Sequence, residues 1–263
     1  MPTFTDAHGV RIHYEASRVP DATAVVQLVH GVGEHIGRYR ELIEALNGAG
    51  YSVWADDHRG HGRTGFEQNG GDRTSLGRPG PGGMRAAIDA VHRFTGVIRE
   101  TEGDEVPLVL LAHSWGSLMA QIILNRHPTD YDGVVLTGTA YRTLLDMNGG
   151  DLNRRHRRLG TTPVEWLSRD PEVAAAFMAD PYTTEVPLRK LFGLIDSARL
   201  LGRPGRTLPP ELPLLIMVGS DDSLGGERSA LKLASAYAKR SGLVDVQLIV
   251  YEGARHEIFN ETN

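Results

Sequence analysis

The chain has 263 residues, of which 40% are hydrophobic, with a formal net charge of −5 and no cysteine. A chain of this length buries about three quarters of its surface on folding, which is enough for one large α/β domain. The negative net charge and the dispersed basic residues argue against nucleic-acid binding, and no apolar run reaches the length of a membrane span. Residues 1–6 are polar and contain no signal-peptide core, so we expect a cytoplasmic protein.

Strands and helices are predicted to alternate along most of the chain, which indicates a mostly parallel sheet with helices on both faces. An N-terminal hairpin is predicted at residues 4–6 and 11–16. Apolar runs predict buried strands at residues 24–29, 107–111 and 212–219, and one more strand is predicted at residues 244–251. Helices are predicted at residues 39–49, 84–101, 115–126 and 227–241. The glycine-rich residues 65–83 are expected to form a flexible loop at the rim.

Residues 141–208 differ from the rest of the chain because they lack a buried-strand pattern and are interrupted by several prolines. They contain two helix-like pieces, at residues 171–179 and 188–201. Because this segment lies between two core strands, we expect it to form a helical cap over the site. The expected core then consists of residues 1–140 and 209–263.

The apolar side chains of the expected cap either line an acyl pocket or pack the cap onto the core. The pocket candidates are Trp166, Phe177, Leu191 and Phe192. A basic cluster at residues 154–158 is either a solvated face or a contact with anionic lipid, to which each basic residue contributes about 1 kcal/mol. Transient contact of the cap with a membrane or micelle therefore stays an open alternative.

Ser114 follows the apolar run at residues 107–111 and opens a predicted helix. A serine on a sharp turn between a strand and a helix is the geometry of a nucleophile elbow, whose usual pattern is Gly-x-Ser-x-Gly. Here Ala112 replaces the first glycine, and Gly116 supplies the second. An isolated serine in such a place is more often a helix N-cap, so the assignment depends on its partners.

A nucleophilic serine needs a base, and the base needs a group that orients it. His256 follows the predicted strand at residues 244–251, and Asp221 and Asp222 follow the strand at residues 212–219. Catalytic groups of open α/β sheets gather at such carboxyl ends, and the order serine, acid, histidine is that of hydrolases built on an α/β sheet. Taken singly, the aspartates could cap a helix and His256 could be an exposed loop residue. Taken together, the three positions predict a catalytic triad.

Acyl transfer also needs backbone N–H donors that stabilise the developing oxyanion. One donor is the amide of the residue after the nucleophile, Trp115, and the other comes from a loop after an early strand. Val32, in the run His30-Gly31-Val32-Gly33, is the candidate for the second donor. We expect His30 and Gly31 beside it, at the substrate pocket.

Four motifs in this order resemble the monoacylglycerol lipase and lysophospholipase group of the α/β-hydrolases. They are His-Gly-Val-Gly-Glu-His at residues 30–35, Asp-His-Arg-Gly-His-Gly at residues 57–62, the elbow around Ser114, and Tyr-Glu-Gly-Ala-Arg-His at residues 251–256. The resemblance runs from about residue 10 to the end of the sequence. It implies an α/β-hydrolase fold and a serine esterase that acts on a monoacylglycerol or lysophospholipid without cofactor or metal.

The resemblance also selects Asp222 over Asp221 as the acid, because the acid of the group falls three residues after the position of Gly219. Two departures stand out. Ala112 replaces the elbow glycine, and the sequence ends seven residues after His256, where the group usually continues into a last helix. We therefore expect the His256 loop to have less support and a looser geometry than usual.

Two further interpretations start from the same part of the chain. Gly31 and Gly33, with Gly37 nearby and Asp56 after the next strand, resemble a dinucleotide fingerprint, but Ile36 occupies the place of the third glycine. A metal hydrolase is suggested by five histidines near strand ends, yet no His-x-His or His-Glu-x-x-His pattern is present. These histidines are His30, His35, His58, His61 and His113.

His58 and His61 belong to the second motif, where we expect structural residues of the rim. With the triad in place, a peptidase, a carbon–carbon bond hydrolase and a cofactor-free haloperoxidase-like enzyme are alternative activities on the same fold. A non-catalytic ligand-binding receptor is the alternative from a different class. The expected partner is a small-molecule or lipid ester, and the sequence does not indicate an oligomeric state.

Overall fold

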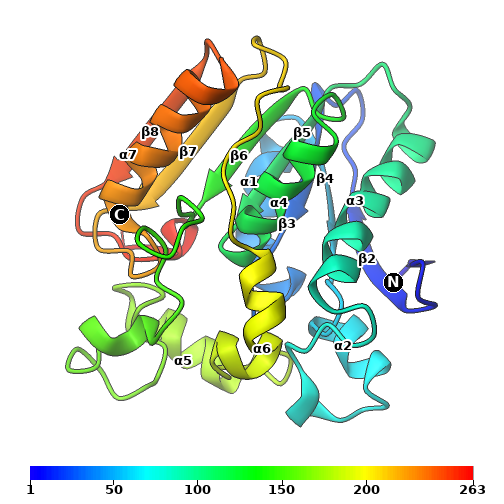
Figure 1. Cartoon of the computed structure of the whole chain (residues 1–263). Coiled ribbons are helices and arrows are strands. Elements are labelled where there is room, and N and C mark those ends of the chain that lie inside the picture. Colours follow the sequence, from blue (N-terminus) through cyan, green and yellow to red (C-terminus); the bar gives the residue numbers. More distant parts are fainter. Residues whose placement is uncertain (263) are drawn as a thin grey trace.

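A computed structural model describes residues 1–262 and contains a mixed sheet flanked by helices (Figure 1). The strands of this described range are β1 Thr3–Thr5, β2 Arg11–Ser17, β3 Ala24–Val29, β4 Tyr51–Asp56, β5 Leu108–His113, β6 Gly133–Thr137, β7 Leu214–Gly219 and β8 Val246–Tyr251. Their order across the sheet is β1-β2-β4-β3-β5-β6-β7-β8. β2 pairs antiparallel with β1 and β4, and every later pair is parallel. The predicted mostly parallel α/β sheet is confirmed.

The helices of the same range are α1 Arg40–Gly48, α2 Gly62–Gln68, α3 Gly83–Glu102, α4 Trp115–Arg126, α5 Pro171–Ala179, α6 Leu188–Arg199 and α7 Gly226–Ala236. Short 3-10 helices lie at Ile36–Tyr39, Arg73–Ser75, Leu152–Arg155 and Ile258–Asn260, and a π-helical turn at Tyr237–Ser241 extends α7. No helix within residues 1–262 is both long and apolar enough to cross a membrane.

β3 shows why the central strands are apolar throughout. Val25 and Val29 face a core cluster shared with α3 and α4, whereas Val26 and Leu28 face a second cluster packed against α1. Successive side chains of a strand point to opposite faces, so a strand covered on both faces must be apolar at every position. Figure 1 shows these helices on the two sides of the sheet.

The prediction of one flexible loop at residues 65–83 is wrong, because α2 begins at Gly62 and a 3-10 helix follows at Arg73–Ser75. The Asp57 carboxylate accepts hydrogen bonds from the backbone amides of Arg63 and Ile36. It thereby satisfies an otherwise unpaired amide in the first turn of α2. The high glycine content of this segment concealed that capping interaction.

The segment between β6 and β7 contains α5 and α6 and lies at the carboxyl ends of the parallel strands (Figure 1). Backbone hydrogen bonds join it to the loops after β3 and β8: Thr184 donates to Gly33 O, and His256 donates to Trp166 O. α6 is kinked at Gly193, whose φ of 67° lies outside the helical region. The kink turns the two ends of α6 in different directions.

The first turn of α4 approaches the end of β3 very closely. A Cβ atom at Gly116 would lie 2.4 Å from the carbonyl oxygen of His30 and 2.5 Å from that of Val29. Both oxygens belong to the main chain, so neither can move without shifting the strand. Gly96, in the middle of α3, has no atom within 4 Å of the corresponding position.

We therefore expect Gly116→Ala to destabilise the protein by about 1–3 kcal/mol through overpacking. Gly96→Ala, the matched control, is expected to stabilise it by about 0.5–1 kcal/mol, because alanine is the better helix former. Urea unfolding of both variants measures this difference. Equal free energies of unfolding for the two variants would contradict the close approach of α4 to β3.

Candidate active site

Ser114 lies on a strained turn between β5 and α4. Its φ is 54° and its ψ is −126°, a conformation that is costly for a residue with a side chain. Its backbone amide donates to Thr137 O at 2.9 Å, which fixes the turn against β6. Ala112, in place of the usual elbow glycine, is fully buried within β5. The turn therefore forms with alanine at this position.

Three side chains from three different strand ends form a continuous hydrogen-bonded chain. His256 Nε2 lies 2.8 Å from Ser114 Oγ, and His256 Nδ1 lies 3.0 Å from Asp222 Oδ1. All three side chains are buried. Burial alone would lower the pKa of His256, but the Asp222 carboxylate outweighs it and, with Glu257 and Glu34 nearby, raises the pKa above its ordinary value. This geometry suits a serine whose proton is taken by an imidazole.

The two neighbouring aspartates have different surroundings. Asp222 contacts His256 and also accepts from the Leu224 amide at 2.8 Å. Asp221 instead forms an ion pair with Arg155, on the segment between β6 and β7, and lies 3.7 Å from His156 Nδ1. The structure therefore brings Asp222, and not Asp221, to the histidine.

The loop of His256 is well supported, contrary to our expectation from the short C-terminal sequence. The Arg255 amide donates to Glu261 Oε1 at 2.7 Å, and the Ser168 hydroxyl donates to Asn260 O at 2.6 Å. The Arg255 guanidinium also donates to the carbonyl oxygens of Glu165 and Ser168. Side chains and carbonyls of the segment between β6 and β7 thus hold the loop.

Val32 and Trp115, the expected oxyanion donors, both line the cavity that contains Ser114. Trp115 is the first residue of α4, so its amide has no acceptor inside the helix. Within residues 1–262, neither amide donates to another group of the protein. The neighbouring Gly31 amide is already engaged, since it donates to Glu34 Oε1 at 2.6 Å. Two free N–H groups are therefore available to a ligand beside Ser114.

A cavity of about 390 Å³ contains Ser114 and His256 and is lined largely by apolar side chains. This volume is typical of small-molecule sites. The apolar lining residues are Val32, Trp115, Leu118, Leu152, Pro163, Val164, Trp166, Leu167, Phe177, Val186, Pro187, Leu188, Leu200 and Leu224. The Trp166 ring lies 4.5 Å from the His256 ring. Trp166 and Phe177 thus lie where the sequence placed them.

Four predicted pocket residues lie outside this lining, and the prediction is wrong for them: His30, Gly31, Leu191 and Phe192. Leu191 and Phe192 point from α6 into the main core, where the Phe192 ring stacks on Trp115 at 5.3 Å. His30 is fully buried behind the loop, with its ring stacked on His58 at 3.8 Å. Sequence periodicity could not distinguish the core face of α6 from its cavity face.

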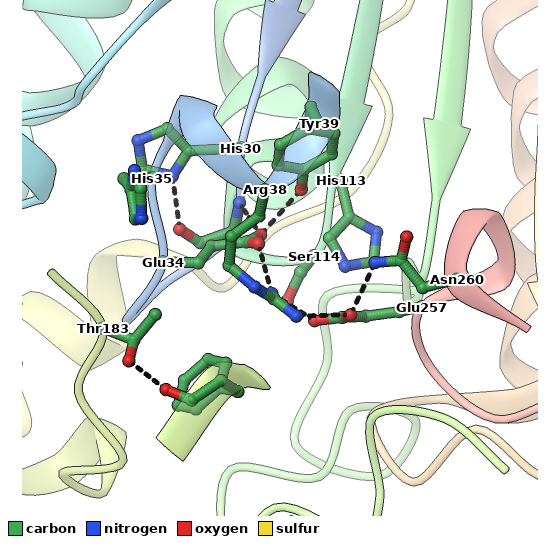
Figure 2. A network of polar contacts seen from close by, with 12 residues as sticks. His30, Glu34, His35, Arg38, Tyr39, His113, Ser114, Thr183, Glu257 and Asn260 are labelled. Atoms are coloured by element: carbon green, nitrogen blue, oxygen red, sulfur yellow. Dashed lines mark hydrogen bonds and ion pairs between the residues drawn. The ribbon is translucent and has the colours of Figure 1, made fainter. Parts of the chain in front are cut away.

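A network of charged residues that the sequence pattern did not indicate lies beside Ser114 (Figure 2). Glu34 accepts from Tyr39 Oη at 2.7 Å and from Arg38 Nη1 at 2.8 Å. Arg38 also binds both carboxylate oxygens of Glu257, at 2.6 and 2.9 Å. Burial raises the pKa of Glu34; at Glu257, the Arg38 guanidinium outweighs the effect of burial and lowers the pKa to about 2. The one sequence signal was the i, i+4 spacing of Glu34 and Arg38.

The second motif contributes buried histidines, not residues of the rim. His58 and His61 are each 1% exposed. His58 Nδ1 contacts Asp56 Oδ2 at 2.9 Å, and His61 Nδ1 contacts Arg59 O at 2.9 Å. Burial lowers the pKa of His61 to about 3, so this imidazole is neutral near pH 7. Asp56 is fully buried as well, and thus cannot bind the ribose required by the dinucleotide interpretation.

None of the five histidines behind the metal interpretation belongs to a group of three metal-ligating side chains. Within residues 1–262, such a group is found only at His92, His127 and Asp130. None of these three lines the cavity of Ser114. The two imidazoles stack face to face at 3.5 Å, and the potential ligand atoms of the three side chains lie within 4.8 Å of one another.

Comparisons with known proteins agree on the family. The family model described as serine aminopeptidase, S33, matches residues 20–263. A monoacylglycerol lipase of Mycolicibacterium smegmatis is 34% identical, over 98% of this chain and 90% of that protein. A monoglyceride lipase of Mus musculus is 29% identical, over 99% of this chain and 84% of that protein. The crystal structure of a thermostable carboxyl esterase from Bacillus coagulans in complex with glycerol matches with a TM-score of 0.84 at 25% identity, over 98% of this chain and 91% of that one.

The neutral, buried His61 predicts a specific dependence of stability on pH. The pKa of His61 falls from 6.5 to about 3 on folding. Its contribution to the free energy of unfolding is therefore fully present above pH 6.5 and is lost progressively as the pH falls toward 3. Between pH 7.5 and pH 5 this one group costs about 2 kcal/mol of unfolding free energy. Urea unfolding of His61→Gln over this range should therefore show a smaller loss than the wild type.

The control is His8→Gln, because His8 is exposed. It should lose stability with falling pH in parallel with the wild type. A His61→Gln curve parallel to that of the wild type would contradict the assignment of a neutral, buried imidazole.

Proposed function

This chain belongs to the serine aminopeptidase S33 family of α/β-hydrolases and is a serine hydrolase, and from this premise we propose that it hydrolyses monoacylglycerols through an acyl-enzyme on Ser114. One observation carries the proposal: the chain Ser114–His256–Asp222 opens into a mainly apolar cavity. A hydrolytic triad and an apolar cavity together suit an ester with a long acyl chain.

In the proposed reaction, Ser114 Oγ attacks the ester carbonyl while its proton passes to His256 Nε2. Asp222 accepts the hydrogen bond from His256 Nδ1, holds the tautomer and stabilises the imidazolium. The amides of Val32 and Trp115 stabilise the tetrahedral oxyanion. His256 then protonates the departing glycerol oxygen, and a water molecule activated by His256 releases the fatty acid and restores Ser114.

The charges of the cavity favour a neutral head group. Among the charged residues of its lining, Glu34 and Glu257 share Arg38, and Asp151 pairs with Arg157. The remaining two, Glu185 and Arg189, carry opposite charges. The lining therefore offers no excess of positive charge to a phosphate, whereas the hydroxyls of glycerol can form hydrogen bonds with its polar groups. The relatives named monoacylglycerol lipase and monoglyceride lipase support the same substrate class.

We further propose that residues 141–208 act as the cap over this cavity, with residues 1–140 and 209–263 as the core. The contribution of Trp166 and Phe177 to the lining supports this division. So do the backbone hydrogen bonds that join the segment to the loops after β3 and β8. In this arrangement the acyl chain lies between the cap and the core.

The first test compares hydrolysis of monoacylglycerols of graded acyl length by the wild type and by Ser114→Ala. We expect the variant to lose kcat by about 10⁴-fold or more, because triad members act as a unit. The matched control is Ser241→Ala, which removes a buried serine hydroxyl that donates to Gly205 O outside the cavity. It should keep wild-type turnover.

Hydrolysis by Ser114→Ala at the wild-type rate would remove Ser114 from the mechanism. Faster turnover of lysophospholipids or peptides than of monoacylglycerols would overturn the proposed substrate.

A second test separates the two aspartates. Asp222→Asn should lower kcat by about 10³- to 10⁴-fold, because an amide no longer holds the productive tautomer of the histidine. Asp221→Asn removes an ion pair with the half-exposed Arg155, and its effect on kcat is expected to stay below about threefold, as for a surface pair. Steady-state kinetics of both variants checks this ranking, and the reverse order would show that Asp221 is the acid.

A further inference from the structure

Arg38 lies between two loops that carry different parts of the proposed machinery. Its guanidinium binds Glu34, two residues after Val32, and Glu257, the residue directly after His256 (Figure 2). We propose that Arg38 is a positioning residue that couples the oxyanion loop, residues 30–34, to the histidine loop, residues 252–257. The proposal rests on the proposed function, in which both loops act on the same ester carbonyl.

On the first side, Glu34 holds the backbone of the oxyanion loop. Its Oε1 accepts from the Gly31 amide at 2.6 Å and from Tyr39 Oη at 2.7 Å, while Oε2 accepts from Arg38 at 2.8 Å. A Cβ atom at Gly31 would lie 2.5 Å from Glu34 Oε1, so the carboxylate packs directly on this backbone. Fixing the Gly31 amide restricts the next peptide plane, which carries the Val32 N–H.

On the second side, Glu257 holds the backbone next to His256. Arg38 binds it in a two-bond fork, and Asn260 Nδ2 donates to its Oε2 at 2.8 Å. The Glu257 amide donates to Leu167 O at 2.7 Å. A planar guanidinium matches a carboxylate in both distance and direction. The fork therefore fixes where the chain at His256 lies relative to Arg38.

The cluster has little freedom to rearrange because it is buried. The side chains of Glu34 and Glu257 are each 5% exposed and that of Arg38 is 10% exposed. Two carboxylates share one guanidinium, and a buried carboxylate that loses its partner is strongly destabilised. Both contacts must therefore form together. Moving one loop away from Arg38 would leave a buried charge unpaired.

Such a coupling matters because the proposed transition state needs both loops at once. The oxyanion forms opposite the Val32 amide while the proton moves to His256, and a 1 Å misplacement of reacting groups can cost about 100-fold in rate. Binding of the acyl chain does not depend on this alignment. Loss of the coupling is therefore expected to lower kcat and to leave KM nearly unchanged.

The test is a double-mutant cycle on kcat with Glu34→Gln, Glu257→Gln and the double variant, with monoacylglycerol as substrate. Glutamine keeps one acceptor oxygen and removes the charge. Each single change should lower kcat about tenfold, and the double variant should be no slower than the worse single variant, since either change already breaks the link. The triple variant that adds Arg38→Gln removes every buried charge of the cluster and should match the double variant.

Multiplicative losses in the double variant, or changes confined to KM, would overturn the proposal. The matched control is Asp6→Asn, which breaks the equally buried ion pair with Arg59 away from the cavity. It should lower the free energy of unfolding and leave kcat unchanged. A fall in kcat with this control would assign the effects at Arg38 to general destabilisation.

The rate at which a fluorophosphonate labels Ser114 provides a readout that needs no ester substrate. If the wild type is labelled but hydrolyses no monoacylglycerol, the proposed function fails and the cycle is measured on labelling rates instead. Labelling of the single Gln variants at the wild-type rate would overturn the role of Arg38. Non-additive losses in labelling would support it.

Discussion

The site depends on one constraint of the parallel sheet: the carboxyl ends of neighbouring strands lie side by side. Ser114, Asp222 and His256 are far apart in the sequence, yet each follows a strand of one continuous ladder from β5 to β8. β3 borders β5 on the other side and supplies the loop with Val32. The end of β7 and the loop after β8 lie so close together that a Cβ atom at Gly219 would be 2.1 Å from Ala254 O. The same sheet edge therefore fixes the proposed nucleophile, base and oxyanion donors.

Burial determines the charge state of the groups around this edge. Desolvation keeps His61 and His113 neutral by lowering the pKa of each to about 3. His256 is equally buried but has the Asp222 carboxylate beside it, and its pKa rises. The difference is the presence of a charged partner, because an opposite charge offsets the cost of desolvation. Of these three imidazoles, His256 is thus the one suited to receive a proton.

The strands β3, β5 and β7 were predictable from the sequence because buried parallel strands leave long apolar runs, and small or polar residues mark where each run stops. The helix α2 was not predictable in the same way, since its start depends on the Asp57 carboxylate, which reaches it through a loop. The cavity lining was predicted in part: Trp166 and Phe177 line it, but Leu191 and Phe192 face the core. A kinked helix has no single apolar face that a sequence pattern can locate.

The charged network around Arg38 escaped sequence analysis for a related reason. Glu34 and Glu257 are separated by most of the chain, and only the fold brings them to one guanidinium. The segment between β6 and β7 is joined to the same two loops, because the Thr184 amide donates to Gly33 O and the Glu257 amide donates to Leu167 O. The groups proposed to react and the groups proposed to hold the acyl chain thus share one hydrogen-bonded frame.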